Sequence, residues 1–371
     1  MKILEPERSA GPLRDEPQVP AHPLRHTRLG PGRGDGTAIR PTRGRRRRIA
    51  GVLAALLVAA GLAVATRSLW EAPAFSPVCV YPRESIAVLG QIDALTGHAY
   101  SCVMTFDNAN PTWATWEVPW FATTKATDQN WAQWVDERAG RRLVITTSLV
   151  PSDAPPNWRQ ICASGAYDGY AATFGRNLVS EGLSRSVLRI APEANDPASG
   201  LGWSGGFQPD MSAWATCWAK EAKAMEVPGS HFVFDWTVNA GYEDIPFSDY
   251  YPGNSVVDVI GIDAYDSLVN GQQVAPGRTR WHLLSHEPGG ILDLVAFAKS
   301  HRKPLSFPEW GAASAPSGGG DDPVYIRHMA QLFKKYHVVF ESYFDENVGG
   351  TLRLGQVPKS LHAYQATVLH G

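Results

Sequence analysis

Two glutamates stand at the ends of apolar, strand-like segments. Glu193 closely follows the run 187–191, and Glu309 lies at the end of the run 305–310. Glycoside hydrolysis requires two carboxyl groups, one as the acid and the other as the nucleophile or base. Either glutamate alone is equally consistent with an ordinary charge at a strand end. We therefore take both as candidate catalytic residues, on the condition that the fold brings them together.

The segments that must position these residues alternate between strand-like and helix-like patterns. Amphipathic stretches at 168–181, 211–225, 290–301 and 323–336 predict helices between apolar, β-branched runs. This alternation predicts a (β/α)8 TIM barrel, whose active site lies at the carboxyl ends of the strands. A doubly wound open sheet is the alternative, although no Gly-x-Gly-x-x-Gly follows the first predicted strand. The predicted strands are 86–91, 102–107, 143–149, 187–191, 232–238, 256–265, 305–310 and 338–344.

The charges divide the chain into two parts. Residues 1–48 hold 12 of the 34 basic and five of the 36 acidic residues, a net charge of +7, which leaves −9 for the rest. Because the first part has hardly any large apolar residues, we expect a disordered basic tail. The acidic remainder argues against a nucleic-acid-binding domain.

An uncharged run at 49–66 directly follows the basic stretch Arg45–Arg48. Its length is near the lower limit for a membrane-spanning helix, and the arginines are expected to stay in the cytoplasm. We predict a transmembrane signal anchor at 49–66, a linker at 67–84 and an extracytoplasmic barrel at 85–371. A cleaved signal peptide is the alternative, because Ala63-Val64-Ala65 has the small-x-small form of a cleavage site. Both alternatives export the barrel.

All four cysteines follow this segment, at Cys79, Cys102, Cys162 and Cys217. Export permits disulfides, and four cysteines allow three pairings. We expect the pairs nearest in sequence, Cys79–Cys102 and Cys162–Cys217, with buried free thiols as the alternative. The sequence has no Cys-x-x-Cys and no His-Glu-x-x-His, so we expect neither a metal site nor a cofactor.

The residues around the two glutamates carry a family resemblance. Residues 189–195, Arg-Ile-Ala-Pro-Glu-Ala-Asn, are similar to the strand-four segment Arg-x-x-His-Glu-x-Asn of glycoside hydrolase family 26. Residues 258–265 resemble the strand-six segment of that family, residues 303–311 its strand-seven segment, and residues 357–364 its closing helix. Over roughly 85–365 the chain thus resembles this β-mannanase-related family of the clan A barrels.

The resemblance implies a retaining glycosidase in which Glu193 is the acid/base and Glu309 is the nucleophile. It places Tyr265 beside the nucleophile and Asp263 in the substrate region, with Arg189 and Asn195 in the same conserved segment. One departure is Pro192, where the family has a histidine, so the resemblance does not extend to mannan as the sugar. Further substrate contacts are expected from aromatic residues at or after strand ends, namely Trp203, Trp236, Trp310 and Tyr343.

We therefore expect a membrane-tethered, extracytoplasmic glycoside hydrolase that is endo-acting on a β-linked polysaccharide. A non-catalytic glycan-binding barrel of the cell envelope is the alternative. A third candidate, an α/β-hydrolase esterase, depends on the motif Gly202-Trp-Ser204-Gly-Gly206. A nucleophile elbow needs a strand before it, and a loop-like segment precedes Ser204 instead.

Overall fold

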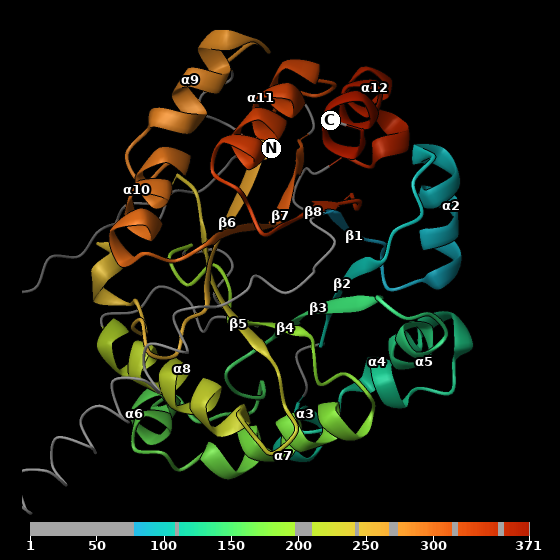
Figure 1. Cartoon of the computed structure of the whole chain (residues 1–371). Coiled ribbons are helices and arrows are strands. Elements are labelled where there is room, and N and C mark those ends of the chain that lie inside the picture. Colours follow the sequence, from blue (N-terminus) through green and yellow to red (C-terminus); the bar gives the residue numbers. More distant parts are fainter. Residues whose placement is uncertain are drawn as a thin grey trace, which may run out of the picture. The chain divides into compact units, whose positions relative to one another are not determined.

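A computed structural model describes residues 78–107, 111–196, 210–241, 245–266, 274–313, 318–347 and 352–370. Eight parallel strands form a closed barrel in the order β1 to β8, with β8 pairing to β1. Helices surround the ring of strands (Figure 1). This confirms the predicted (β/α)8 barrel. The predicted tail and anchor lie outside the described residues, within which no helix has the length and apolarity needed to cross a membrane.

Strands and helices alternate along the described chain. The strands are β1 (Val78–Tyr81), β2 (Cys102–Phe106), β3 (Arg142–Thr147), β4 (Val187–Ile190), β5 (Val233–Asn239), β6 (Val259–Asp266), β7 (Leu305–Ala312) and β8 (Phe340–Phe344). The helices are α2 (Ile86–Thr96), α3 (Trp113–Trp116), α4 (Trp120–Thr123), α5 (Trp131–Asp136), α6 (Trp158–Ala163), α7 (Asp168–Ser180), α8 (Met211–Met225), α9 (Arg278–His286), α10 (Ile291–His301), α11 (Pro323–Lys335) and α12 (Pro358–Tyr364). Short 3-10 or π turns lie at Thr127–Gln129, Phe247–Asp249, Leu354–Gln356 and Gln365–Leu369.

The first predicted strand is wrong, because residues 86–91 belong to helix α2. The Ser85 side chain caps this helix by accepting a hydrogen bond from the Val88 amide, and Gly97 ends it in the left-handed region. Leu89 and Ile92 are its buried apolar residues, a three-residue spacing that is typical of a helix face. Helical periodicity was therefore present in a segment short enough to resemble a strand.

The true first strand, β1, lies within the segment 67–84 that was predicted as a linker. The barrel therefore includes residues before 85. The other seven strands overlap the predicted segments, and their ends differ from the predicted ends by at most three residues. The four predicted helices correspond to α7, α8, α10 and α11. Asp322 caps α11 through hydrogen bonds from two backbone amides, with Pro323 in the first turn.

The interior of the barrel is apolar at the amino-terminal ends of the strands and polar toward their carboxyl-terminal ends. Valines from β3 to β6 form a lower layer with the cysteines of β1 and β2 and with Phe340. Because side chains alternate along a strand, residues two and four positions further also face inward. On β4 this places Arg189 two residues above Val187, and on β5 it places Asp235 and Thr237 above Val233. All three of these polar residues are buried.

Two disulfides connect neighbouring elements, as the sequence predicted. Cys79–Cys102 joins β1 to β2, and Cys162–Cys217 joins α6 to α8. No free cysteine is present among the described residues.

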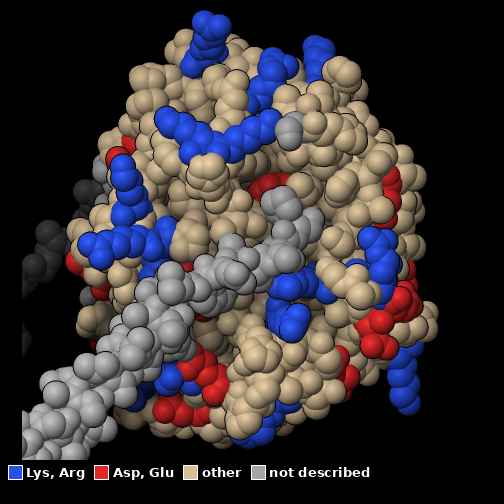
Figure 2. Space-filling view, viewed as in Figure 1, with Lys and Arg blue, Asp and Glu red and all other residues tan. Residues whose placement is uncertain are grey.

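On the face drawn in Figure 2, basic and acidic side chains are interspersed among other residues.

Candidate active site

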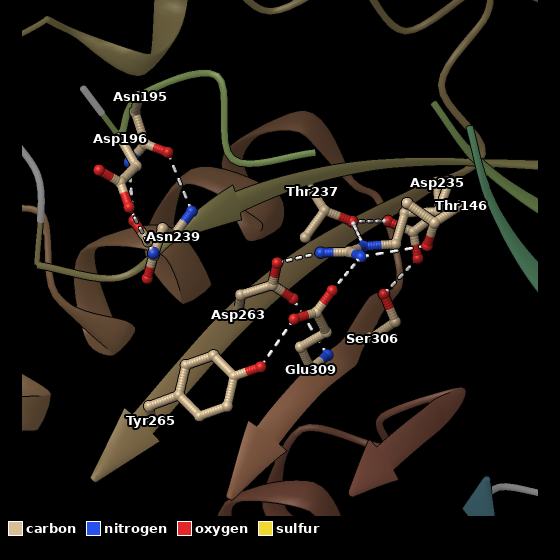
Figure 3. Close-up of polar contacts among 11 residues, drawn as sticks. Thr146, Asn195, Asp196, Asp235, Thr237, Asn239, Asp263, Tyr265, Ser306 and Glu309 are labelled. Carbon is tan, nitrogen blue, oxygen red and sulfur yellow. Dashed lines mark hydrogen bonds and ion pairs between the residues drawn. The ribbon is translucent and has the colours of Figure 1, made fainter. Parts of the chain in front are cut away.

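Arg189 on β4 is the centre of the polar layer, where it contacts Thr146, Thr237, Asp263 and Glu309. These four residues are labelled in Figure 3. The Nη1 of Arg189 donates to Glu309 Oε1, and its Nη2 donates to Asp263 Oδ2. Its Nε donates to Thr237 Oγ1 and its Nη1 to Thr146 Oγ1, each at 3.2 Å. The guanidinium is fully buried, and the neighbouring carboxylates raise its pKa above the usual value against the effect of burial. Arg189 thus joins side chains from β3, β5, β6 and β7.

Glu309 owes its inward direction to an irregularity in β7. Ser306 and Glu309 both face the interior, although residues three apart on a regular strand face opposite sides. The pairing of β7 with β8 shifts register between Phe307 and Trp310, which includes Pro308, a residue that favours bulges. Tyr265 then donates to Glu309 Oε2 at 2.7 Å. Both oxygens of the Glu309 carboxylate are therefore held in place.

Glu193 lies just beyond β4 on a strained backbone. Its φ is +58°, and that of Ala191 is +43°, a region that costs a residue with a side chain about 1–2 kcal/mol. The Glu193 amide donates to the Thr237 carbonyl at 3.1 Å, which fixes this turn to β5. One carboxylate oxygen each from Glu193, Asp263 and Glu309 lie within 4.8 Å of one another. The fold thus brings the two predicted catalytic glutamates together.

The protonation of this cluster follows from its burial and charge. Burial and, after it, the negative charge of Glu309 raise the pKa of Glu193 to about 8, against the opposing effect of Arg189. Burial likewise raises the pKa of Asp263, again opposed by Arg189. Glu193 therefore keeps its proton at neutral pH, which suits an acid. The three carboxyl groups resemble a cation site in composition, but the Arg189 cation already binds Asp263 and Glu309.

Asp235 forms a supporting layer beneath Arg189 that the sequence analysis missed. Its carboxylate accepts hydrogen bonds from Ser306 Oγ at 2.5 Å and from Thr237 Oγ1 at 2.8 Å. Burial raises the pKa of Asp235 to about 6. A Cβ on Gly261 would lie 2.4 Å from both Asp235 Oδ1 and Thr237 Oγ1, so glycine is required there. The sequence did contain a signal for this layer. Asp235 and Thr237 are polar residues two positions apart in an otherwise apolar strand, so both side chains point to the same face of the sheet.

An aromatic wall, made of Tyr81, Phe106, Tyr265 and Phe344, lies at the ends of β1, β2, β6 and β8. Tyr81 and Phe344 stack with ring centroids 4.6 Å apart, and Phe106 packs edge-on against Tyr81 at 5.1 Å. Tyr265 packs edge-on against Phe344 at 6.2 Å. Since Tyr265 also binds Glu309, the wall adjoins the carboxylate cluster. Tyr81 and Phe106 were not predicted as site residues, and Tyr81 was placed in the linker.

Asn195 is held by the backbone of β5. Its Nδ2 donates to the Asn239 carbonyl at 2.7 Å, and its Oδ1 accepts from the Asn239 amide at 2.9 Å. In Figure 3 this pair lies apart from the group around Glu309. Asn195 therefore fixes the loop after β4, and the substrate contact expected of it from the sequence stays a prediction.

Three predicted aromatic contacts point away from the barrel interior. Trp236 is fully buried against Tyr251 and Phe297, the latter on α10. Trp310 is also fully buried and packs on α11 and α12. Tyr343 packs on Trp310. Each alternates with an inward-facing residue on its strand, so these three side chains belong to the packing between strands and helices. Trp203 lies outside the described residues, as does Ser204.

Comparisons with known proteins find similarity at the level of fold. No family model matches the sequence, and no curated protein matches it. The YdhT protein from Bacillus subtilis is similar in structure with a TM-score of 0.53 at 15% identity, over 79% of this chain and 85% of that chain. A GH26 β-mannanase from Bacteroides ovatus has a TM-score of 0.53 at 12% identity, over 80% and 88%.

A fungal β-1,4-galactanase structure covers 79% of this chain and 100% of its own, with a TM-score of 0.51 at 12% identity. At such identities the similarity concerns the arrangement of strands and helices. The chain therefore has a fold of the kind found in GH26 β-mannanases.

Proposed function

We propose that this protein is a glycoside hydrolase that cleaves a β-linked polysaccharide with retention of configuration. The observation that carries the proposal is the proximity of Glu193 and Glu309, whose carboxylate oxygens approach within 4.8 Å from β4 and β7. Carboxyl groups about 5–5.5 Å apart are typical of retaining enzymes, whereas inverting enzymes leave room for a water.

In the first step the Glu309 carboxylate attacks the anomeric carbon of the bound sugar. The bond from that carbon to the glycosidic oxygen breaks as the new ester bond forms, and Glu193 gives its proton to the departing oxygen. Glu193 holds that proton at neutral pH because burial and the charge of Glu309 raise its pKa to about 8.

In the second step a water attacks the anomeric carbon and displaces Glu309. Glu193 now accepts a proton from this water. The change of role follows from charge, because esterified Glu309 no longer carries the negative charge that raises the pKa of Glu193. Hydrolysis restores the carboxylate and with it the higher pKa.

Arg189 and Tyr265 position the nucleophile in this scheme. They donate to opposite oxygens of Glu309, so the attacking group is fixed before substrate binds. Asp263 Oδ1 accepts a hydrogen bond from the Glu309 backbone amide at 3.0 Å. Asp263 thereby orients both the nucleophile backbone and Arg189, and its predicted place in the substrate region becomes a positioning role.

The aromatic wall supports a sugar as the ligand. Pyranose rings present apolar C–H faces, which pack well on aromatic side chains. Tyr81, Phe106 and Tyr265 keep intermediate exposure, whereas Trp236 and Trp310 are fully buried. The named activities of two similar structures, a β-mannanase and a β-1,4-galactanase, suggest β-linked polysaccharides as first substrates.

The proposal is tested by reducing-end release from β-1,4-mannan, β-1,4-galactan and other β-linked polysaccharides. We expect wild-type protein to release product from at least one of them. Glu309→Ala should lose activity by about 10⁴-fold or more, as expected when a nucleophile is removed. The exposed residue Glu181 provides a matched control, Glu181→Ala, which should keep full activity. Sugar binding without product release would favour the non-catalytic glycan-binding alternative.

We also propose that the barrel acts outside the cytoplasm, tethered by the segment 49–66. The support is the pair of disulfides, since disulfides persist in oxidising compartments. Protease added to intact cells should release an active barrel while leaving an amino-terminal fragment in the membrane fraction. Complete protection from the protease would contradict the external location, and free release without cleavage would favour a cleaved signal peptide.

A further inference from the structure

A buried ion pair involves Asp266, the residue that follows Tyr265 at the end of β6. Arg280 of α9 is fully buried, and its Nε donates to Asp266 Oδ1 at the end of β6. Its Nη2 donates to the Asp266 carbonyl at 2.7 Å, and its Nη1 to the Val274 carbonyl at 2.8 Å. One guanidinium therefore binds both described ends of the connection between β6 and α9.

The connection between β7 and α11 closes on the same pair. The Gly319 amide donates to the Asp266 carbonyl at 3.2 Å, and the Gly320 amide donates to the Ala313 carbonyl at 2.8 Å. A Cβ on Gly319 would lie 2.1 Å from Asp266 Oδ2 and 3.0 Å from Arg280 Nε. Gly319 is thus required by close approach, which explains part of the glycine run at 318–320.

These contacts fix the backbone on both sides of Tyr265. The carbonyl of Asp266 receives Arg280 and Gly319, as described above. The carbonyl of Ala264 accepts a hydrogen bond from the Tyr325 hydroxyl of α11 at 2.6 Å. Tyr265 is therefore held between two anchored peptide groups, which limits how far its hydroxyl can move from Glu309.

We propose that Arg280, Asp266 and Gly319 are positioning residues that set the Tyr265–Glu309 hydrogen bond of the catalytic site. This inference deepens the proposed function and rests on it. It assigns the three residues a catalytic effect that is transmitted entirely through Tyr265. A displacement of about 1 Å in a catalytic group can lower the rate by about 10²-fold.

The first test is Gly319→Ala, measured as kcat and KM on the polysaccharide that wild type cleaves. We expect kcat to fall by about 10²-fold while KM changes much less. The matched control is Gly355→Ala, because a Cβ there would meet only Leu95 Cδ2, at 3.6 Å. Unchanged kcat in folded Gly319→Ala protein, as judged by circular dichroism, would overturn the proposal.

The second test is a double-mutant cycle with Tyr265→Phe. If Gly319 acts through Tyr265, the double variant should be no slower than Tyr265→Phe alone. Losses that multiply would show that Gly319 acts independently and would overturn the proposal. Should Gly319→Ala fail to fold, Arg280→Lys replaces it in the cycle, because a lysine keeps the charge but cannot supply the fixed planar fork of arginine.

A crystal structure of the variant separates this proposal from the proposed function. The Tyr265 Oη to Glu309 Oε2 distance, 2.7 Å in the wild-type chain, should exceed about 3.0 Å, the upper limit of a normal O–H···O hydrogen bond. An unchanged distance would overturn the positioning role whatever the enzyme does. Failure of the proposed function would appear differently, as wild-type protein that releases no product.

Discussion

Arg189 and Glu309 are 120 residues apart in sequence and form a direct, buried ion pair inside the barrel. The same guanidinium also binds Asp263, so one cation serves two carboxyl groups while Glu193 lies within 4.8 Å of both. A buried charge without a partner is very unfavourable. The surplus of carboxyl groups over cations therefore favours a proton on Glu193, which is where the proposed mechanism needs it.

Glu193 should determine the alkaline limb of the pH–rate profile. Its pKa is about 8, so the acid is protonated below that value and is lost as the pH rises through it. We expect kcat/KM to fall about tenfold per pH unit above pH 8, measured by reducing-end release between pH 5 and 10. With aryl glycosides, whose leaving group can depart without being protonated, kcat/KM of Glu193→Gln should no longer fall above pH 8. A wild-type kcat/KM that stays constant up to pH 10 would contradict the assignment of Glu193 as the acid.

Removal of the Arg189 guanidinium should damage both folding and activity. Arg189→Met leaves Glu309 and Asp263 buried without their cation, and breaking a buried pair in this way costs about 3–5 kcal/mol. We expect a correspondingly lower free energy of unfolding in urea and no detectable turnover. Arg138→Met, at an exposed position, serves as the control and should behave as wild type. Equal stability of the two variants would contradict the central place of Arg189.

The two disulfides should each contribute measurably to stability. Cys162–Cys217 closes a separation of 55 residues and Cys79–Cys102 one of 23. Removing a native disulfide typically costs about 2–5 kcal/mol. We expect Tm to fall when Cys162 and Cys217 are both replaced by alanine. Peptide mapping without reduction should recover both predicted pairs, whereas four free thiols in unreduced, unfolded protein would contradict them.

Glu341 should make the fold less stable at alkaline pH. It is buried, with Trp310 Nε1 and the Tyr364 hydroxyl donating to its carboxylate. Burial raises its pKa to about 8 from 4.5, so between these values the folded state keeps a proton that the unfolded state releases. Its favourable contribution is complete below pH 4.5 and is lost as the pH rises through 8.

The variant Glu341→Gln tests this linkage, because glutamine is neutral at every pH and nearly the same shape. From pH 5 to pH 9 the unfolding free energy of the variant should gain about 4 kcal/mol relative to wild type, because this range covers most of the interval between the unfolded pKa of 4.5 and the folded pKa of about 8. Urea unfolding at the two pH values measures the difference. A constant offset between the two proteins would show that Glu341 does not titrate in this range.

The barrel could be predicted because its strands are buried on both faces and therefore read as continuous apolar runs. The first strand was missed, and α2 was taken for a strand, because both apolar segments are short. β1 has only four residues, and α2 has an apolar face within an 11-residue helix. Periodicity cannot separate elements this short.

The sequence predicted the site residues whose type alone indicates the chemistry. It did not predict the residues whose role depends on whether the side chain faces the barrel interior or the surrounding helices. Glu193, Asp263 and Glu309 meet as expected, since each follows or ends an apolar strand. Trp236 and Trp310 were misjudged because their strand positions suit a site but their side chains face the helices. For Trp310 the register shift in β7 decides which neighbour points inward, and that shift depends on pairing with β8, which the sequence of β7 alone does not contain.

The most direct test of the central claim is the configuration of the first product, followed by proton NMR during hydrolysis of a β-linked polysaccharide that the wild-type protein cleaves. Two glutamates whose carboxylate oxygens approach within 4.8 Å predict a β-configured reducing end that appears first and then mutarotates. An α-configured first product would contradict the retaining mechanism with Glu309 as the nucleophile.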